Sequence, residues 1–158
     1  MARAQIKTVK ASQTEMTELV LPNDTNPLGN LLGGRLMHWI DIAAGIAALR
    51  HTGRACVTAS VDELNFRHPV KLGEVVILKA SVNRVYTTSL EVGVQVTAEN
   101  TLTGDRVCTN TAYLTFVAID ERGKPVPVPP VKPVTAEEQR RFEDAGRRRQ
   151  IRLRHRKT

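Results

Sequence analysis

An aspartate lies inside a nearly uncharged stretch of this 158-residue chain, in the segment "LMHWIDIAAGIAAL". Counted in helical turns, Asp41 shares a face with Met37, Ala44 and Ala48. Apolar neighbours disfavour the charged form of a carboxylate, so the pattern predicts a raised pKa for Asp41, which suits a general base. The same pattern also fits an aspartate that points to solvent or pairs with an arginine.

The loop ahead of this aspartate carries Asn30, followed by Gly33 and Gly34. Asn30 is either a turn or capping residue, or an amide that positions water or a carbonyl oxygen. The glycine pair opens a predicted helix, where the first backbone N–H groups have no partner within the helix. Because glycine lets a ligand approach the backbone, Gly33 and Gly34 suit the binding of an oxyanion.

Other polar residues give weaker signals. Arg84 and Ser89 flank the turn "RVYTTS", which is either a plain hairpin or a place for a phosphate group. The serines lack the sequence context of a nucleophile elbow, and no Ser–His–acid or Cys–His arrangement emerges. No spacing of His, Cys and carboxylate residues resembles a metal cage, so neither a metal nor another cofactor is expected.

The elements that must position these residues are one helix and a run of strands. The helix is predicted from Gly33 to His51, and its apolar residues lie on most sides, which is typical of a buried helix. Alternating patterns predict strands at 17–22, 56–66, 74–85, 89–100 and 106–120. This order predicts an α+β fold, with a curved antiparallel sheet of about five strands around one central helix, and it argues against a Rossmann-type sheet.

The chain divides into four predicted parts. Residues 1–16 form a lead-in, 17–120 the folded domain, and 121–134 a Pro-rich linker. The last part, 135–158, is predicted to begin with a short helix, capped by Thr135 and Glu138, and to end in a disordered basic tail.

The net charge of +7 comes from that tail. From Arg147 onward there are seven Arg and Lys and no acid, whereas elsewhere 16 basic residues balance 16 acidic ones. With no aromatic platform among basic residues, this distribution argues against a nucleic-acid protein. The sequence also shows no secretory signal and no apolar run long enough to span a bilayer, so a cytoplasmic location is expected.

The segment "LVLPNDTNPLGNLLGGRLMHWIDIAAGIAALRHTGRACVTASVDELNF" resembles the acyl-CoA hydrolase branch of the hotdog-fold thioesterases. The resemblance continues through "HPVKLGEVV", "SLEVGVQVTAEN" and "AYLTFVAID". It implies a central helix wrapped by a sheet, hydrolysis of acyl-CoA to free fatty acid and CoA, and at least a homodimer, often a trimer of dimers.

The resemblance also implies roles for residues. The catalytic aspartate of the family falls on Asp41 and a catalytic asparagine on Asn30, with Gly34 N–H polarising the thioester carbonyl. In relatives with two fused domains these two residues come from different domains, so a homodimer would build composite sites. Gly33, Arg84 and Ser89 are then expected near the CoA part.

Two alternatives remain at this point. A hotdog module could bind acyl-CoA or fatty acid without turnover, although such a module needs neither Asn30 nor Asp41. The basic tail could instead bind nucleic acid or an anionic surface as a secondary interaction.

Overall fold

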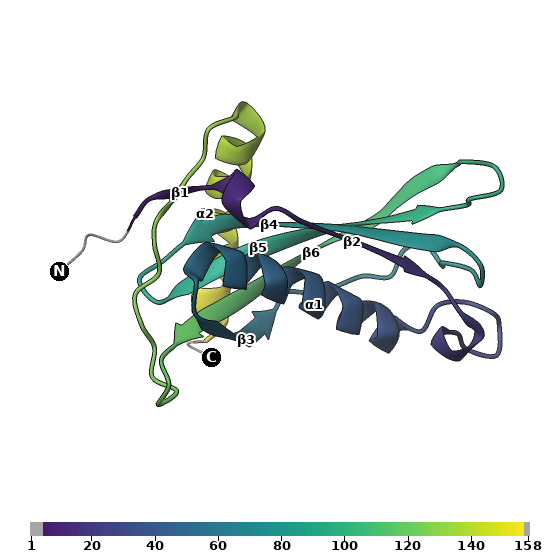
Figure 1. Ribbon diagram of the computed structural model, residues 1–158, viewed down its shortest axis with the longest axis horizontal. Coiled ribbons are helices and arrows are strands. Elements are labelled where there is room, and N and C mark those ends of the chain that lie inside the picture. Colours follow the sequence, from purple (N-terminus) through teal and green to yellow (C-terminus); the bar gives the residue numbers. More distant parts are fainter. Residues whose placement is uncertain (1–4, 157–158) are drawn as a thin grey trace.

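The computed structural model describes residues 5–156, which build one five-stranded antiparallel sheet around a long helix (Figure 1). The strand order is β2-β4-β5-β6-β3. The bounds are β2 Thr14–Leu19, β3 Ala55–Val61, β4 Val75–Val85, β5 Ser89–Glu99 and β6 Arg106–Ile119. This is the hotdog fold, as the sequence predicted.

The central helix α1 spans Gly33–Thr52, close to the predicted 33–51. It stops at Gly53, whose positive φ of 64° places it in the left-handed region that favours glycine. Its alanines at 43, 44, 47 and 48 are fully buried. Because these side chains are small, α1 lies close against the sheet, and they account for much of its buried face.

Different helices cover the two faces of the sheet. Alternate residues of β4, β5 and β6 point into the apolar core beneath α1, among them Leu78, Val92 and Leu114. Residues between them face the other way. This outer face of the sheet is covered by α2, Ala136–His155 (Figure 1), whose Arg148 binds Glu91 there. The sheet is therefore sandwiched between a buried helix and a basic one.

Residues before β2 are tied to the body of the protein. A parallel two-stranded sheet joins β1, Lys7–Thr8, to β7, Val131–Lys132. The 3-10 helix η1, Val9–Ser12, follows, and the buried Ser12 hydroxyl accepts a hydrogen bond from Val82 N at 2.9 Å. The first four residues of the predicted lead-in lie outside the described part of the chain.

Two strands have other bounds than the sequence predicted. The first strand lies at 14–19 and not at 17–22, because it pairs with β4 from Thr14↔Ala80 to Leu19↔Val75. The strand expected at 56–66 begins at Ala55 and ends at Val61, and the next residue, Asp62, forms an ion pair with Arg152.

The predicted short C-terminal helix is also wrong in length. Thr135 caps it as expected, with its hydroxyl accepting from Glu138 N at 3.1 Å. However, α2 continues for 20 residues through most of the basic segment, which was expected to be disordered. It does so because arginines of this segment bind acidic side chains of the sheet.

A buried histidine holds the Pro-rich segment against the end of α1. His51 is fully buried, and its Nε2 lies 2.7 Å from Pro129 O. Because a carbonyl only accepts, Nε2 carries the hydrogen, and the buried Nδ1 has no partner within residues 5–156. Burial lowers the pKa of His51 from its ordinary value of 6.5.

We therefore expect the protein to lose stability as the pH falls below about 6.5. In that range the unfolded state binds a proton that the folded state excludes, so the free energy of unfolding decreases with decreasing pH. Thermal melts at pH 7.5 and 5.5 measure this loss. His51→Gln keeps a donor but does not titrate, and it should reduce the difference between the two pH values. An unchanged difference in this variant would assign the pH dependence to other groups.

Candidate active site

The loop between β2 and α1 is organised by a buried carboxylate that sequence reasoning missed. Asp24 is 7% exposed, and its Oδ2 accepts from Leu21 N at 2.9 Å. Its Oδ1 lies 3.2 Å from Nε of Arg35 in the first turn of α1. Asp24 O also accepts from Leu32 N at 2.9 Å. These bonds fix the loop against the start of α1.

Two asparagines of this loop are linked to each other. Asn26 Oδ1 accepts hydrogen bonds from Leu28 N at 3.0 Å and from Asn30 N at 3.1 Å. Asn26 N in turn donates to Asn30 O at 2.9 Å. With its oxygen engaged, the Asn26 amide has an oriented NH₂ group as a donor. Asn30 is held through its backbone and bridges to Lys71.

The start of α1 presents unpaired backbone donors, as predicted. Leu32 at the N-cap supplies no side-chain bond, and within residues 5–156 the Gly33 and Gly34 N–H groups have no acceptor. A Cβ on Gly33 would lie 3.3 Å from the Phe66 ring, whereas one on Gly34 would meet nothing within 4 Å. The open approach to the backbone is therefore at Gly34, and Phe66 occupies the space at Gly33.

Asp41 lies two turns into α1, and its Oδ1 accepts from the Thr58 hydroxyl at 2.8 Å. Thr58 is on β3, where the pairing with β6 is interrupted between Thr58 and Ser60. Such bulges re-aim side chains and are frequent beside active sites. Thr58 was not predicted as a site residue, because only the folded structure brings it to Asp41.

The apolar enclosure expected around Asp41 is not present in a single chain. Asp41 is exposed, as are Ile42 and Leu49 on the same helix. The reason is that α1 buries its alanines and Ile40 against the sheet, which leaves this side uncovered. Covering the carboxylate would require a second chain.

Arg84 and Ser89 lie on the outer face of the sheet, which is the face that α2 covers, whereas Asp41 is on α1. The Arg84 guanidinium stacks on the Phe142 ring at 4.1 Å and donates to Phe142 O at 3.2 Å. Both contacts are made to α2, so Arg84 serves first to hold that helix. Ser89 begins β5 and lines a groove beside the second half of α2.

A buried charge cluster on the outer face was not expected from the sequence. Glu91 is fully buried, and Arg148 binds it with Nε at 2.8 Å and Nη2 at 2.9 Å. Asn83 Nδ2 donates to the same carboxylate at 3.0 Å. Arg152 lies 2.8 Å from Asp62 and 3.4 Å from Glu91. The four-residue spacing of Arg148 and Arg152 puts both on one face of α2.

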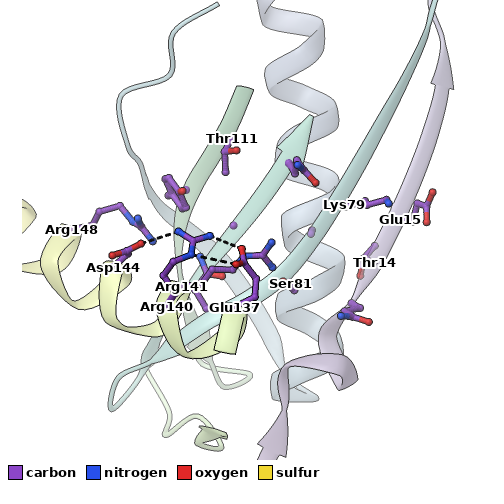
Figure 2. Close-up of a pocket in the computed structure, with 16 residues that line it drawn as sticks. Thr14, Glu15, Lys79, Ser81, Thr111, Glu137, Arg140, Arg141, Asp144 and Arg148 are labelled. Atoms are coloured by element: carbon purple, nitrogen blue, oxygen red, sulfur yellow. Dashed lines mark hydrogen bonds and ion pairs between the residues drawn. The ribbon is translucent and has the colours of Figure 1, made fainter. Parts of the chain in front are cut away.

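A polar cavity of about 590 Å³ lies between the first half of α2 and the outer face of the sheet (Figure 2). Figure 2 shows Arg140 and Arg141 bound to Glu137, and Arg140 also to Asp144. The charged groups of this cavity thus neutralise one another. It contains none of the predicted site residues, and the candidate site lies on the opposite side of the sheet.

The described residues hold no group of three or more His, Cys, Asp or Glu side chains that could bind a metal ion. In the same part of the chain, neither helix has the length and apolar character needed to cross a membrane.

The fold, with an aspartate on a central helix whose first N–H groups are free, is that of the hotdog-fold thioesterases. A sequence model of the thioesterase superfamily matches residues 28–104. A Bacillus subtilis protein named "Uncharacterized acyl-CoA thioester hydrolase YkhA" is 47% identical over 129 residues, which cover 82% of this chain and 75% of that protein. The chain belongs to the acyl-CoA hydrolase branch of this superfamily.

Solved structures of acyl-CoA thioesterases resemble this fold over nearly the whole chain. An apo-hexameric acyl-CoA thioesterase has a TM-score of 0.92 and 43% identity, covering 96% of this chain and 97% of that one. The acyl-CoA hydrolase of Staphylococcus aureus, in complex with butyryl-CoA, CoA and CoA disulfide, has a TM-score of 0.90 and 36% identity, covering 96% and 92%. That hydrolase was also solved as three variants, in which an aspartate, an asparagine or a threonine is replaced by alanine.

Proposed function

We propose that the protein hydrolyses acyl-CoA thioesters to free fatty acid and CoA, with Asp41 as the central catalytic group. The observation that carries this proposal is the Asp41–Thr58 hydrogen bond of 2.8 Å, two turns into a helix whose start has unpaired N–H groups. In the Staphylococcus aureus hydrolase the spacing from the substituted aspartate to the substituted threonine equals that from Asp41 to Thr58. A non-catalytic acyl-CoA binding module is the alternative.

The same comparison bears on the choice of asparagine. The spacing from the substituted asparagine to the aspartate in that hydrolase equals that from Asn26 to Asp41, and not that from Asn30. The fixed oxygen and oriented NH₂ group of Asn26 also suit a donor to water or to a carbonyl oxygen. We therefore assign the amide role to Asn26 in preference to Asn30, the residue chosen from the sequence.

We expect Asn26→Ala to lower kcat by about 100-fold, the usual effect of losing one donor to the transition state. Asn30→Ala should leave kcat within about threefold, because its backbone bonds to Asn26 persist. Steady-state rates on one acyl-CoA measure both. If only Asn30→Ala were inactive, the assignment would revert to Asn30.

The proposed chemistry uses groups of two copies of this chain, because Gly34 and Asp41 lie two turns apart on α1, about 10 Å, and cannot reach one carbonyl from the same chain. The Gly34 N–H of one protomer polarises the thioester carbonyl, while Asp41 of its partner takes a proton from water as the water oxygen attacks the carbonyl carbon. The carbon–sulfur bond then breaks, and the proton passes to the leaving thiolate. In a second form of the mechanism the Asp41 carboxylate attacks directly, and water hydrolyses the resulting anhydride.

The role of the Gly34 N–H can be tested with a matched pair of variants. Gly34→Pro removes this N–H in the first turn of α1, where proline is tolerated, and we expect kcat to fall about 100-fold. Gly34→Ala keeps the N–H and adds a Cβ into open space, so it should retain most of the activity. Circular dichroism confirms that both variants are folded. Equal losses in the two variants would contradict an oxyanion role for this N–H.

The assembly proposed is a homodimer with sites shared between chains, further assembled as a trimer of dimers. In one chain the surface around Asp41 exposes Leu32, Ile42, Leu49 and Val57. Apolar residues grouped in this way are typical of a protein interface. The edge strand β3, which carries Thr58, pairs only with β6 in the described chain and has its other edge open. A second chain here would enclose Asp41.

The activity is tested by free-thiol release from acyl-CoAs of increasing chain length, from acetyl to palmitoyl. Turnover of at least one supports the proposal, and binding without turnover of any would favour the non-catalytic alternative. We place no cofactor in this reaction and propose a cytoplasmic location.

A further inference from the structure

The charge of α2 changes abruptly along the helix. Its first part, residues 136–144, carries four acidic side chains and two arginines, whereas residues 145–156 carry six arginines and no acid. We refer to residues 145–156 as the basic half of α2. Ion pairs within the first part neutralise its charges, so the positive charge of the helix is concentrated in the basic half.

Half of these six arginines have acidic partners in the chain. Arg148 binds Glu91, and Arg152 lies 2.8 Å from Asp62, so both hold the helix on the outer face of the sheet. Because they are four positions apart, they lie on one face of α2, and the residues between them point to its flanks or to solvent. Arg147 is exposed and pairs with an acid of the first part.

The other three arginines, Arg149, Arg154 and Arg156, form no ion pair with a carboxylate in the part of the chain that the structure describes. Arg154 and Arg156 are exposed. The Arg149 guanidinium stacks on the Tyr86 ring at 3.8 Å, which orients it while leaving its N–H edges as donors. The basic half therefore carries more positive charge than is needed to hold it on the sheet.

Exposed apolar side chains lie between these arginines. Ile151 is 53% exposed and Leu153 is 36% exposed. Arginines interspersed with exposed apolar side chains are typical of a helix that lies on an anionic membrane, where the cations bind phosphates and the apolar side chains enter the layer below. The phosphates of a nucleic acid would gain nothing from Ile151 and Leu153, and the basic half has no aromatic residue on which a base could stack. The composition therefore favours a lipid surface over a nucleic acid.

The proposed homodimer would bring two basic halves to the same side of the assembly. The basic half lies beside β3, since residues of both line a common groove on the outer face of the sheet. If two β3 edges pair in antiparallel orientation, their two-fold axis is normal to the sheet, so the outer faces of both protomers point the same way. Both sets of unpaired arginines would then face one surface, which strengthens binding to an extended partner such as a membrane.

We propose that the basic half of α2 binds the surface of an anionic lipid membrane. Arg149, Arg154 and Arg156 contact the headgroup phosphates, and Ile151 and Leu153 enter the layer beneath them. The helix lies on the membrane and does not cross it. This inference goes beyond the proposed function, because binding needs no turnover. If the protein does hydrolyse acyl-CoA, the contact places it where apolar acyl chains and free fatty acids partition.

Co-sedimentation of the full chain with vesicles tests this inference. We expect binding to vesicles of phosphatidylglycerol and phosphatidylcholine in equal parts, weaker binding as salt is added, and no binding to phosphatidylcholine alone. Arg154→Glu with Arg156→Glu should lower the partition coefficient at least about tenfold, since each basic residue near an anionic surface contributes to binding. The control is Lys10→Glu with Lys132→Glu, which changes the net charge equally at exposed residues of η1 and β7 and should bind within about threefold of wild type.

Three outcomes would overturn the inference: equal binding to both kinds of vesicle, unchanged binding of the arginine variant, or an equal loss in the lysine variant. Retention of a short duplex DNA by a protein that binds no vesicle would assign the basic half to nucleic acid instead. Circular dichroism confirms that the variants are folded. Thiol release from acetyl-CoA, a soluble substrate, should be the same for wild type and the arginine variant. If the wild type hydrolyses no acyl-CoA, the proposed function fails, and the vesicle experiment still decides the membrane contact.

Discussion

Asp41→Asn is expected to lower kcat/KM for acyl-CoA by about a thousandfold, since losing a positioned base costs on the order of 100- to 10,000-fold. The substitution keeps the size of the side chain and its ability to accept from Thr58, but an amide can neither take a proton from water nor attack a thioester. The expected loss is therefore in kcat, with a small change in KM. Thiol-release rates over a range of substrate concentrations separate the two.

Thr58→Val provides a graded comparison for that result. It removes the 2.8 Å hydrogen bond to Asp41 and keeps the shape of the side chain, so the carboxylate stays but is less well oriented. We expect a loss of about tenfold, in keeping with one hydrogen bond to a charged group. Asp41→Asn with more than a tenth of wild-type activity would show that the reaction does not depend on this carboxylate.

The largest effect on stability is expected from Arg148→Ala. Glu91 is fully buried, and the substitution removes both hydrogen bonds of the Arg148 guanidinium to it. Breaking a buried ion pair on one side typically costs about 3–5 kcal/mol, because the remaining charge is left without compensation. We expect about 3 kcal/mol, since Arg152 at 3.4 Å and Asn83 at 3.0 Å still bind Glu91. Urea unfolding measures the change.

Two controls separate the buried charge from general damage to α2. Arg147→Ala removes an exposed arginine of the same helix, and its exposed pair with Asp144 should contribute at most about 1 kcal/mol. Glu91→Leu combined with Arg148→Met removes both charges, and the double variant should recover most of the stability. A double variant as unstable as Arg148→Ala would show that packing, and not the unpaired carboxylate, causes the loss.

The central part of the fold was predictable because local patterns and tertiary packing agree there. The alternation in 74–85 and 89–100 corresponds to β4 and β5, and the helix from Gly33 ends within one residue of its predicted end. The first strand was misplaced because its bounds depend on pairing with β4, which the pattern around Thr17 does not encode. The ends of such a strand are determined by pairing with residues that are distant in the sequence.

The α2 helix shows the limit of local reasoning. A run of arginines without apolar periodicity is typical of a solvated tail, and only the outer face of the sheet supplies the partners that make it a packed helix. Glu91, at a polar position of a central strand, was the available signal. A buried carboxylate there requires a cation, and Arg148 and Arg152 have the right spacing on the last helix.

The candidate site was predictable in part. Asp41 and the Gly34 N–H follow from an acid and a glycine pair at the start of an apolar helix. Thr58 and the bonds between Asn26 and Asn30 could not be predicted, since they arise from the packing of β3 on α1 and from the conformation of a loop. The exposure of Asp41 in one chain was also unforeseen, and it makes the partner chain part of the proposed site.

The most direct test of the shared site is complementation between two inactive variants. Chains with Asn26→Ala and chains with Asp41→Asn, carrying different affinity tags, are produced together, and mixed assemblies are purified through both tags. If the two residues act from different chains, one of the two sites of each mixed dimer has both residues intact, so purified mixed dimers should have about half of the wild-type activity, and mixed hexamers with random pairing about a quarter. Activity no higher than that of either variant alone would contradict the shared site.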